Sequence, residues 1–169
     1  MTGPVLETPR LRLRPHLPGD APFMVRLNAN PACVRYTGDR AFGDPSEADA
    51  VIAALRLQWA ARRMGRLLVE ERCSGAPVGW CGLKWHETAG EADLGYRFLE
   101  ERWGRGYATE ASRACIAQAW GPLGLDHIVA RAMPENVASV RVLEKLGFRF
   151  TGPERDGDGV VHGFRLDRP

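Results

Sequence analysis

Several features are missing from this 169-residue sequence, and each absence argues against a class of protein. The N-terminus carries no apolar signal core, and no hydrophobic run approaches the length of a membrane span. Internal repeats, linkers and low-complexity tracts are also absent. The sequence therefore predicts a soluble, cytoplasmic protein without membrane contacts, built as one domain over residues 1–169.

The sequence also has few cysteines and a small net charge. The four cysteines show neither CxxC pairing nor regular spacing, which favours reduced thiols over disulfides or zinc, so no metal is predicted. The formal net charge is only +2, too small to indicate nucleic-acid binding by itself. Three arginines alternate with leucines over residues 10–14, but so few charges fit a solvated strand face better than a nucleic-acid site.

The most informative stretch is residues 102–111, RWGRGYATEA. In the segment before it, residues 93–99, apolar and other positions alternate as in a strand. An alanine-rich helix over about 109–120 follows it. The sequence thus predicts the succession of strand, glycine-rich loop and helix.

Such a loop is suited to binding a phosphate. Gly104 and Gly106 have no Cβ, so the backbone can turn tightly, and the free N–H groups at the helix start can approach a ligand. The helix dipole favours an anion there, and Arg102 and Arg105 could add charge-assisted bonds. The alternative is a tight turn whose glycines serve geometry and whose arginines serve solubility.

Two common nucleotide loops do not match. The Walker loop requires Gly-Lys-Ser/Thr, which is absent. The dinucleotide pattern GxGxxG fails because Thr109 stands where its third glycine belongs, and the loop does not follow a first strand near the N-terminus.

WGRGYATEA, followed by PENVASVRVLEKLGF, resembles the GNAT superfamily of N-acetyltransferases and specifically its RimJ/RimL-type branch. The resemblance extends to LETPRLRLRP near the N-terminus and to GEADLGYRFLEERWGRG, and is weakest between residues 40 and 75. It implies an α/β fold, a single GNAT-like domain with a mixed, mostly antiparallel sheet and flanking helices. Two parallel strands, at 94–99 and 127–133, would splay apart around the pantetheine arm of acetyl-CoA.

The resemblance also implies the cosubstrate site. The family's pyrophosphate loop, Q/R-x-x-G-x-G/A, aligns with Trp103 to Ala108, with Trp103 in place of its first residue. Asn136 is expected both to cap the helix that follows and to bond the pantetheine chain, and Ser139 to lie near the sulfur. The residues expected to bind acetyl-CoA are Tyr96, Arg97, Phe98, Arg102, Trp103, Gly104, Arg105, Gly106, Tyr107, Ala108, Thr109, Asn136 and Ser139.

The implied reaction is attack of a neutral amine on the acetyl thioester in a ternary complex. Backbone N–H groups around Tyr96 to Phe98 would face the carbonyl oxygen, as the family's β-bulge does. Ser139 or a water could protonate the thiolate, and Asp93 is the candidate base or water-orienting residue, unless it is merely a strand-end acid. Leu143 stands where many family members carry a tyrosine acid. His86 is another candidate base, although a surface histidine is the commoner case.

The free energy needed to deprotonate an amine indicates which kind of acceptor is favoured. Deprotonating a lysine at pH 7 costs roughly 4.6 kcal/mol, whereas an α-amine costs about 1 kcal/mol. A site without a strong base therefore favours a protein or peptide N-terminus or a small-molecule amine. Residues 31–45 and a helix over 46–63 capped by Ser46 are expected to shape an acceptor pocket that is uncharged or of mixed charge, although their apolar positions also fit plain core.

Two other functions stay open at this point. The domain could bind acyl-CoA without turnover, as a sensor or partner module, or it could be a nucleotide-binding module. The oligomeric expectation is a monomer or a homodimer.

Overall fold

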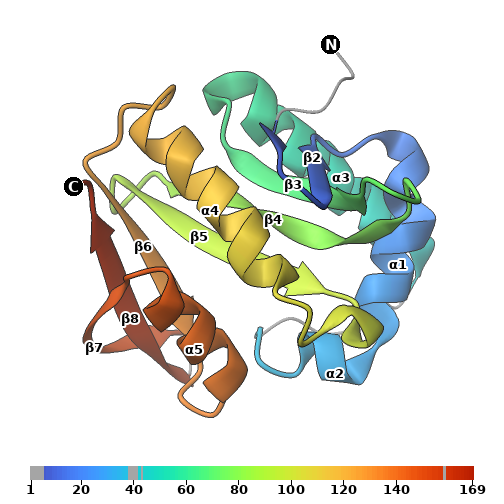
Figure 1. Ribbon diagram of the computed structural model, residues 1–169. Coiled ribbons are helices and arrows are strands. Elements are labelled where there is room, and N and C mark those ends of the chain that lie inside the picture. The colour runs from blue at the N-terminus through green and yellow to red at the C-terminus, as the bar shows by residue number, and fades with distance from the viewer. Residues whose placement is uncertain (1–5, 38–41, 43, 158) are drawn as a thin grey trace.

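Eight strands form one mixed sheet in the order β1-β2-β3-β4-β5-β6-β8-β7 (Figure 1). The computed structural model describes residues 6–37, 42, 44–157 and 159–169. The strands are β1 Leu6–Glu7, β2 Leu11–Arg14, β3 Gly65–Glu71, β4 Pro77–His86, β5 Glu91–Phe98, β6 His127–Ala132, β8 Gly159–Asp167 and β7 Arg149–Asp156. Neighbouring strands are antiparallel except β5 and β6, so the mostly antiparallel mixed sheet is confirmed.

The parallel pair is joined over only a short length. β5 and β6 are in register at Asp93 with Val129 and at Leu94 with Ala130. β5 then continues to Phe98 along β4, while β6 pairs with β8 on its other side. The two strands therefore part after Leu94, which confirms the predicted splay.

Helices cover both faces of the sheet. They are α1 Ala21–Ala29, α2 Pro31–Val34, α3 Pro45–Arg62, α4 Tyr107–Trp120 and α5 Val137–Lys145, with short 3-10 turns η1 Pro18–Asp20 and η2 Glu100–Arg102. Figure 1 shows α4 crossing the sheet over β4 and β5. Ala111, Cys115 and Ala119 of α4 are fully buried, because their small side chains let the helix pack closely on the strands.

The opposite face of the sheet packs against the early helices. Leu68 of β3 joins a cluster with Phe23 and Leu27 of α1. Trp80 of β4 also contacts the cluster that contains Ile52 of α3. The sheet is therefore the middle of three layers, with α1 and α3 on one face and α4 on the other.

The expected cap of the helix over 46–63 was wrong. Helix α3 begins at Pro45, and its cap is Asp44, whose carboxylate accepts from the N–H of Ser46 at 2.6 Å. At the C-terminal end of the chain, β7 runs to Asp156 and β8 starts at Gly159, so these two strands pair along most of their length.

No helix in the described part of the chain is long and apolar enough to cross a membrane. The cysteine thiols are free, with the sulfurs of Cys81 and Cys115 buried 3.8 Å apart.

Candidate functional site

The glycine-rich loop has the backbone that its sequence predicts. Gly104 has φ +71° and Gly106 has φ +78°, both in the left-handed region. A Cβ at Gly104 would meet nothing within 4 Å, and one at Gly106 would meet only the Arg10 guanidinium at 3.5 Å. Glycine is thus required here for backbone conformation, and the space beside both residues is open to a ligand.

Side chains from distant segments brace the start of α4. Thr8 Oγ1 donates to Glu110 at 2.6 Å, and Arg10 bonds the same carboxylate through its backbone N–H and Nε. Arg10 Nη1 also donates to the carbonyl oxygen of Arg105 at 2.9 Å. Although burial opposes it, these bonds hold the pKa of Glu110 below its ordinary value. The N-terminal segment therefore stabilises the loop conformation.

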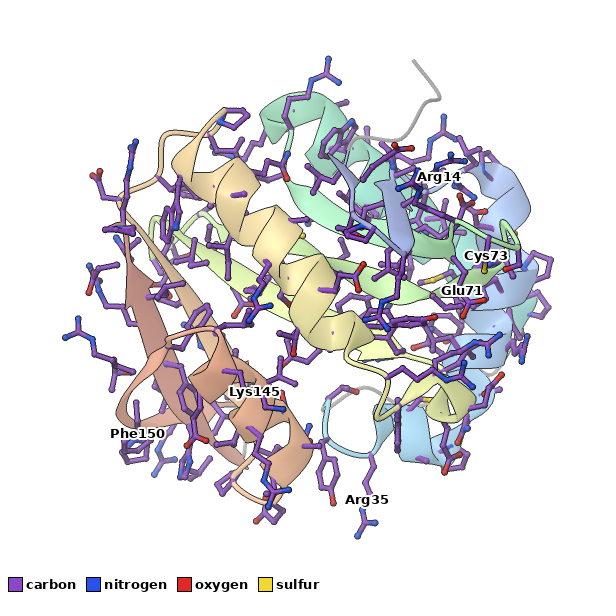
Figure 2. All side chains as sticks on the ribbon, viewed as in Figure 1. Arg14, Arg35, Glu71, Cys73, Lys145 and Phe150 are labelled. Atoms are coloured by element: carbon purple, nitrogen blue, oxygen red, sulfur yellow. The ribbon has the colours of Figure 1, made fainter. Side chains whose placement is uncertain are left out.

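A second brace lies on the β3 side of the loop. The Tyr107 hydroxyl donates to Glu71 at 2.8 Å and lowers the pKa of that carboxylate. Arg102 turns toward Glu71 as well, with Nε 3.4 Å from Oε1. In Figure 2, Glu71 and Lys145 appear on opposite sides of the N-terminal end of α4.

The exposed part of the loop can bind an anion. Trp103, Gly104, Arg105 and Gly106 are exposed, and the first N–H groups of α4, from Tyr107 to Thr109, have no acceptor within the helix. Their dipoles and the Arg105 cation favour a phosphate group. The loop follows the end of β5 in the chain.

At the gap between β5 and β6, some backbone N–H groups of β5 point away from β4 and into the gap. The N–H of Leu99 donates to Val78 at 3.0 Å on the β4 side. Because N–H directions alternate along a strand, those of Tyr96 and Phe98 point to the β6 side, where the strands have parted. Two donors therefore face the gap in line.

The predicted β-bulge at this position is absent. β4 and β5 stay in register from Gly79 with Phe98 to His86 with Glu91. The departure of β6, rather than an extra residue in β5, is what turns the two N–H groups toward the gap.

A hydroxyl pair spans the gap. The Tyr96 and Ser139 hydroxyl oxygens lie 2.9 Å apart, and Tyr96 also lies within bonding distance of the Ser139 carbonyl at 3.2 Å. Burial raises the pKa of Tyr96 well above its ordinary value, so its hydroxyl stays protonated. Ser139 is held in place because Asn136 Oδ1 accepts from its N–H at 3.2 Å, which confirms Asn136 as the helix cap. Leu143, one turn further on, is buried core.

A cleft of about 800 Å³ joins this gap to the face of the sheet covered by α1 and α3. Its walls include side chains from both of the segments expected to shape an acceptor pocket, with residues 38–41 and 43 outside the described part. Those wall residues are Tyr36, Thr37, Phe42, Glu47, Val51, Leu55 and Gln58. Of these seven side chains only Glu47 is charged.

Asp93 lies in the cleft between two guanidinium groups. Arg66 Nη2 donates to Asp93 Oδ2 at 2.7 Å, and Arg131 Nη1 is 3.4 Å from Oδ1. Arg131 is fixed in turn by Glu91 at 2.7 Å and Glu154 at 2.8 Å. Asp93 is 8% exposed, so these contacts take place largely away from solvent. The arrangement makes Asp93 the centre of a charge network.

Gly95 permits that network. A Cβ on Gly95 would lie 2.6 Å from Cζ of Arg66, which crosses it to reach Asp93. The glycine is therefore needed for close approach of the guanidinium, not for a turn.

The predicted role of Arg97 does not match its position. Its side chain bonds Asn28 of α1, and its guanidinium carbon lies 5.2 Å from the centre of the Trp80 ring. Strand alternation turns its N–H toward β4. Arg97 therefore lies on the acceptor face of the sheet, away from the loop and the hydroxyl pair.

Sequence reasoning missed Arg66 and Arg131, and it treated His86 as a minor candidate. His86 lines the cleft with Nε2 3.9 Å from Asp93. Strand alternation placed Arg66 on one face of β3, but only the register with β4 and β5 brings it to Asp93. Among the described residues, no three His, Cys, Asp or Glu side chains are grouped to hold a metal ion.

Comparison with known proteins agrees with this geometry. A family model described as the acetyltransferase (GNAT) domain matches residues 10–149. The chain is 32% identical over 155 residues to the uncharacterized N-acetyltransferase p20 of Bacillus licheniformis, covering 89% of this chain and 85% of that protein.

Solved structures share the fold. An acetyltransferase from Agrobacterium tumefaciens str. C58 has a TM-score of 0.85 at 27% identity, covering 99% of this chain and 96% of that one. RimL, a ribosomal L7/L12 alpha-N-protein acetyltransferase in complex with coenzyme A, has a TM-score of 0.83 at 15% identity, covering 95% of each chain. The second likeness is one of fold alone.

Proposed function

The chain belongs to the GNAT acetyltransferase family, and from that premise we propose that it moves the acetyl group of acetyl-CoA to the α-amine of a protein or peptide N-terminus, or to a small-molecule amine. The observation that carries the proposal is the placement of three features along β5. The glycine loop follows the end of β5, the gap lies where β6 leaves that strand, and Tyr96, Asn136 and Ser139 line the acceptor cleft.

In this proposal the loop holds the pyrophosphate. Trp103 to Thr109 surround it, with N–H groups of the first turn of α4 and the Arg105 side chain as donors. Asn136 and the β5 edge bond the pantetheine arm through amide and backbone groups. Acetyl-CoA supplies an activated acetyl thioester at the deep end of the gap.

The residues at that end match the demands of acyl transfer. The N–H groups of Tyr96 and Phe98 stabilise negative charge on the carbonyl oxygen as the amine attacks. Ser139, hydrogen-bonded to Tyr96 at 2.9 Å, donates a proton toward the departing sulfur and regains one from the amine nitrogen, which loses its second proton as the C–S bond breaks. This pair takes the place of the tyrosine that Leu143 replaces.

Charge in the cleft supports a small or N-terminal amine as acceptor. The cleft walls carry the acids Glu47, Asp93 and Asp156 beside the cations Arg66, Lys84, Arg97 and Arg131. Such a mixture does not form the acidic trough that a polycation would favour. RimL, which shares the fold, acts on a protein α-amine by its name.

A thiol-release assay tests the proposal. Acetyl-CoA is incubated with the protein and, separately, amino acids, short peptides, polyamines and aminoglycosides. Release is expected with α-amines or small monoamines. Strong selectivity for polyamines or aminoglycosides would refute the acceptor class and leave the reaction intact.

One observation favours a second function. Leu143 is a core residue, 1% exposed, at the position where many members of the family have a tyrosine that acts as general acid. A sensor that binds acyl-CoA without turnover tolerates that replacement. Release of no thiol with any amine, together with tight acetyl-CoA binding by calorimetry, would select the sensor.

A further inference from the structure

We propose that His86, oriented by Asp93, accepts the proton of the acceptor ammonium group, directly or through a bridging water. This inference rests on the proposed acetyltransferase function and assigns one residue of its acceptor site. Asp93 is then a positioning residue rather than the base.

Position is the first support. His86 ends β4 on the acceptor face, and its side chain is 36% exposed where it lines the cleft. Water and an incoming amine can therefore reach the imidazole. One edge of the ring faces Asp93, since Nε2 lies 3.9 Å from Oδ2 of Asp93.

The engagement of Asp93 is the second support. Both of its oxygens face guanidinium groups, Arg66 at 2.7 Å and Arg131 at 3.4 Å. Because its oxygens already accept from these two cations, Asp93 is poorly placed to take a proton from the acceptor ammonium group. Imidazole is the side chain that exchanges protons near neutral pH, and it is the nearby group left with that capacity.

The pair also lies on the acceptor face beside the start of the gap. β5 and β6 part directly after Leu94, so the deep end of the gap lies beside Gly95. Asp93 precedes Gly95 on the same strand face, and His86 contacts Asp93. An amine that reaches the gap from the cleft thus passes this pair.

Several charged groups surround His86 on the neighbouring elements. They are Lys84 of β4, Glu87 after β4, Glu91 and Asp93 of β5, Arg66 of β3, Arg131 of β6, and Glu47 and Arg62 of α3. Arg62 bonds Glu87 at 2.6 Å, and Arg131 bonds Glu91 at 2.7 Å. The net field at the imidazole is therefore a balance of paired charges.

The step balances as follows. His86 Nδ1, the ring nitrogen that does not face Asp93, takes a proton from the R–NH₃⁺ group, and the freed lone pair of R–NH₂ attacks the acetyl carbonyl carbon. The new C–N bond forms and the C–S bond breaks, with the electron pair leaving on sulfur. The nitrogen loses a second proton, the thiolate gains one, and His86 releases its own to solvent.

The test compares His86→Gln and Asp93→Asn with the wild type and with His127→Gln, a matched control. His127 begins β6 and does not line the cleft. The pH profile of kcat/KM is measured by thiol release, together with kcat, the acceptor KM and acetyl-CoA affinity.

His86→Gln is expected to lower kcat about 100-fold at neutral pH, the usual range for a lost general base. Acetyl-CoA affinity should stay within about twofold, because the residue lies outside the loop. The rate should then keep rising toward high pH, where the amine loses its proton unaided. Asp93→Asn should lower kcat but keep the wild-type titration limb.

Two results overturn the inference. If the titration limb of the pH profile of kcat/KM survives in His86→Gln and disappears in Asp93→Asn, Asp93 is the base. A His86→Gln enzyme as active as His127→Gln at every pH would remove His86 from the reaction. In both cases the wild type turns over, whereas a wild type that releases no thiol with any amine refutes the proposed function as well.

Discussion

The two halves of the site are built in different ways. The cofactor half, meaning residues 102–110 with the gap between β5 and β6, draws most of its groups from one continuous segment. The acceptor half, meaning the network around Asp93 with His86 and Trp80, draws its groups from β3, β4, β5 and β6. One half is local in sequence and the other is assembled by the sheet.

This difference separates two kinds of sensitivity. In the cofactor half, backbone conformation matters, because Gly104 and Gly106 adopt positive φ beside open space. In the acceptor half, close contact matters, because Gly95 has an ordinary strand conformation but no room for a Cβ. A substitution in one half should therefore change one property of the enzyme and spare the other.

The largest effect is expected from a substitution that disrupts only the acceptor half. Gly95→Ala places a methyl group where the Arg66 guanidinium crosses, and so separates Arg66 from Asp93. Turnover should fall about 100-fold, as expected when catalytic groups move by about an ångström. Acetyl-CoA affinity by calorimetry should stay within about twofold.

Gly19→Ala is the control for that change, since a Cβ at Gly19 meets nothing within 4 Å. Its turnover should match the wild type. A folded Gly95→Ala enzyme with full turnover would show that the position of Arg66 is irrelevant to the reaction.

The next effect breaks the cofactor half. Gly106→Glu puts bulk and negative charge at the start of α4, where the pyrophosphate is proposed to bind. The dissociation constant of acetyl-CoA should rise at least about tenfold, or about 1.4 kcal/mol. Gly106→Ala imposes the φ strain without the charge and should have a smaller effect. Unchanged affinity in a folded Gly106→Glu variant would contradict the loop assignment.

A smaller effect is expected from Ser139→Ala, which tests whether Ser139 acts in turnover or in acetyl-CoA binding. Ser139→Ala removes the hydroxyl that bonds Tyr96 at 2.9 Å but keeps the Asn136 cap, which uses the backbone N–H. We expect kcat to fall about tenfold and acetyl-CoA affinity to change less than about twofold. Equal losses in both would make Ser139 a binding residue only.

The smallest functional effect is expected at His16, which lies outside both halves. His16 is 2% exposed, and both ring nitrogens lack a hydrogen-bond partner in the described part of the chain. Burial lowers its pKa in the folded protein to about 4, so below its ordinary value of 6.5 the unfolded chain binds the proton more readily.

Stability should therefore fall as the pH drops from about 6.5 to about 4, by on the order of 3 kcal/mol from this residue. His16→Leu should remove that part of the pH dependence in urea unfolding, with kcat and acetyl-CoA affinity unchanged at pH 7.5. An identical acid transition in the variant would assign the loss to other groups.

The sequence by itself determined what depends on neighbours along the chain. The left-handed glycines, the Asn136 cap, the strand before the loop and the strand at 127–132 follow from local conformational preference and periodicity, whereas the splay of the two strands was implied by the family resemblance. The motif that signals the family lies in that same continuous segment.

Only the tertiary structure decided what depends on register. Arg66 reaches Asp93 because β3, β4 and β5 align Arg66 with Gly82 and Gly82 with Gly95. That alignment turned the predicted base into the centre of an ion network and brought His86 beside it. Strand alternation assigns a face to each of these side chains, but long-range backbone pairing sets which residues on that face meet.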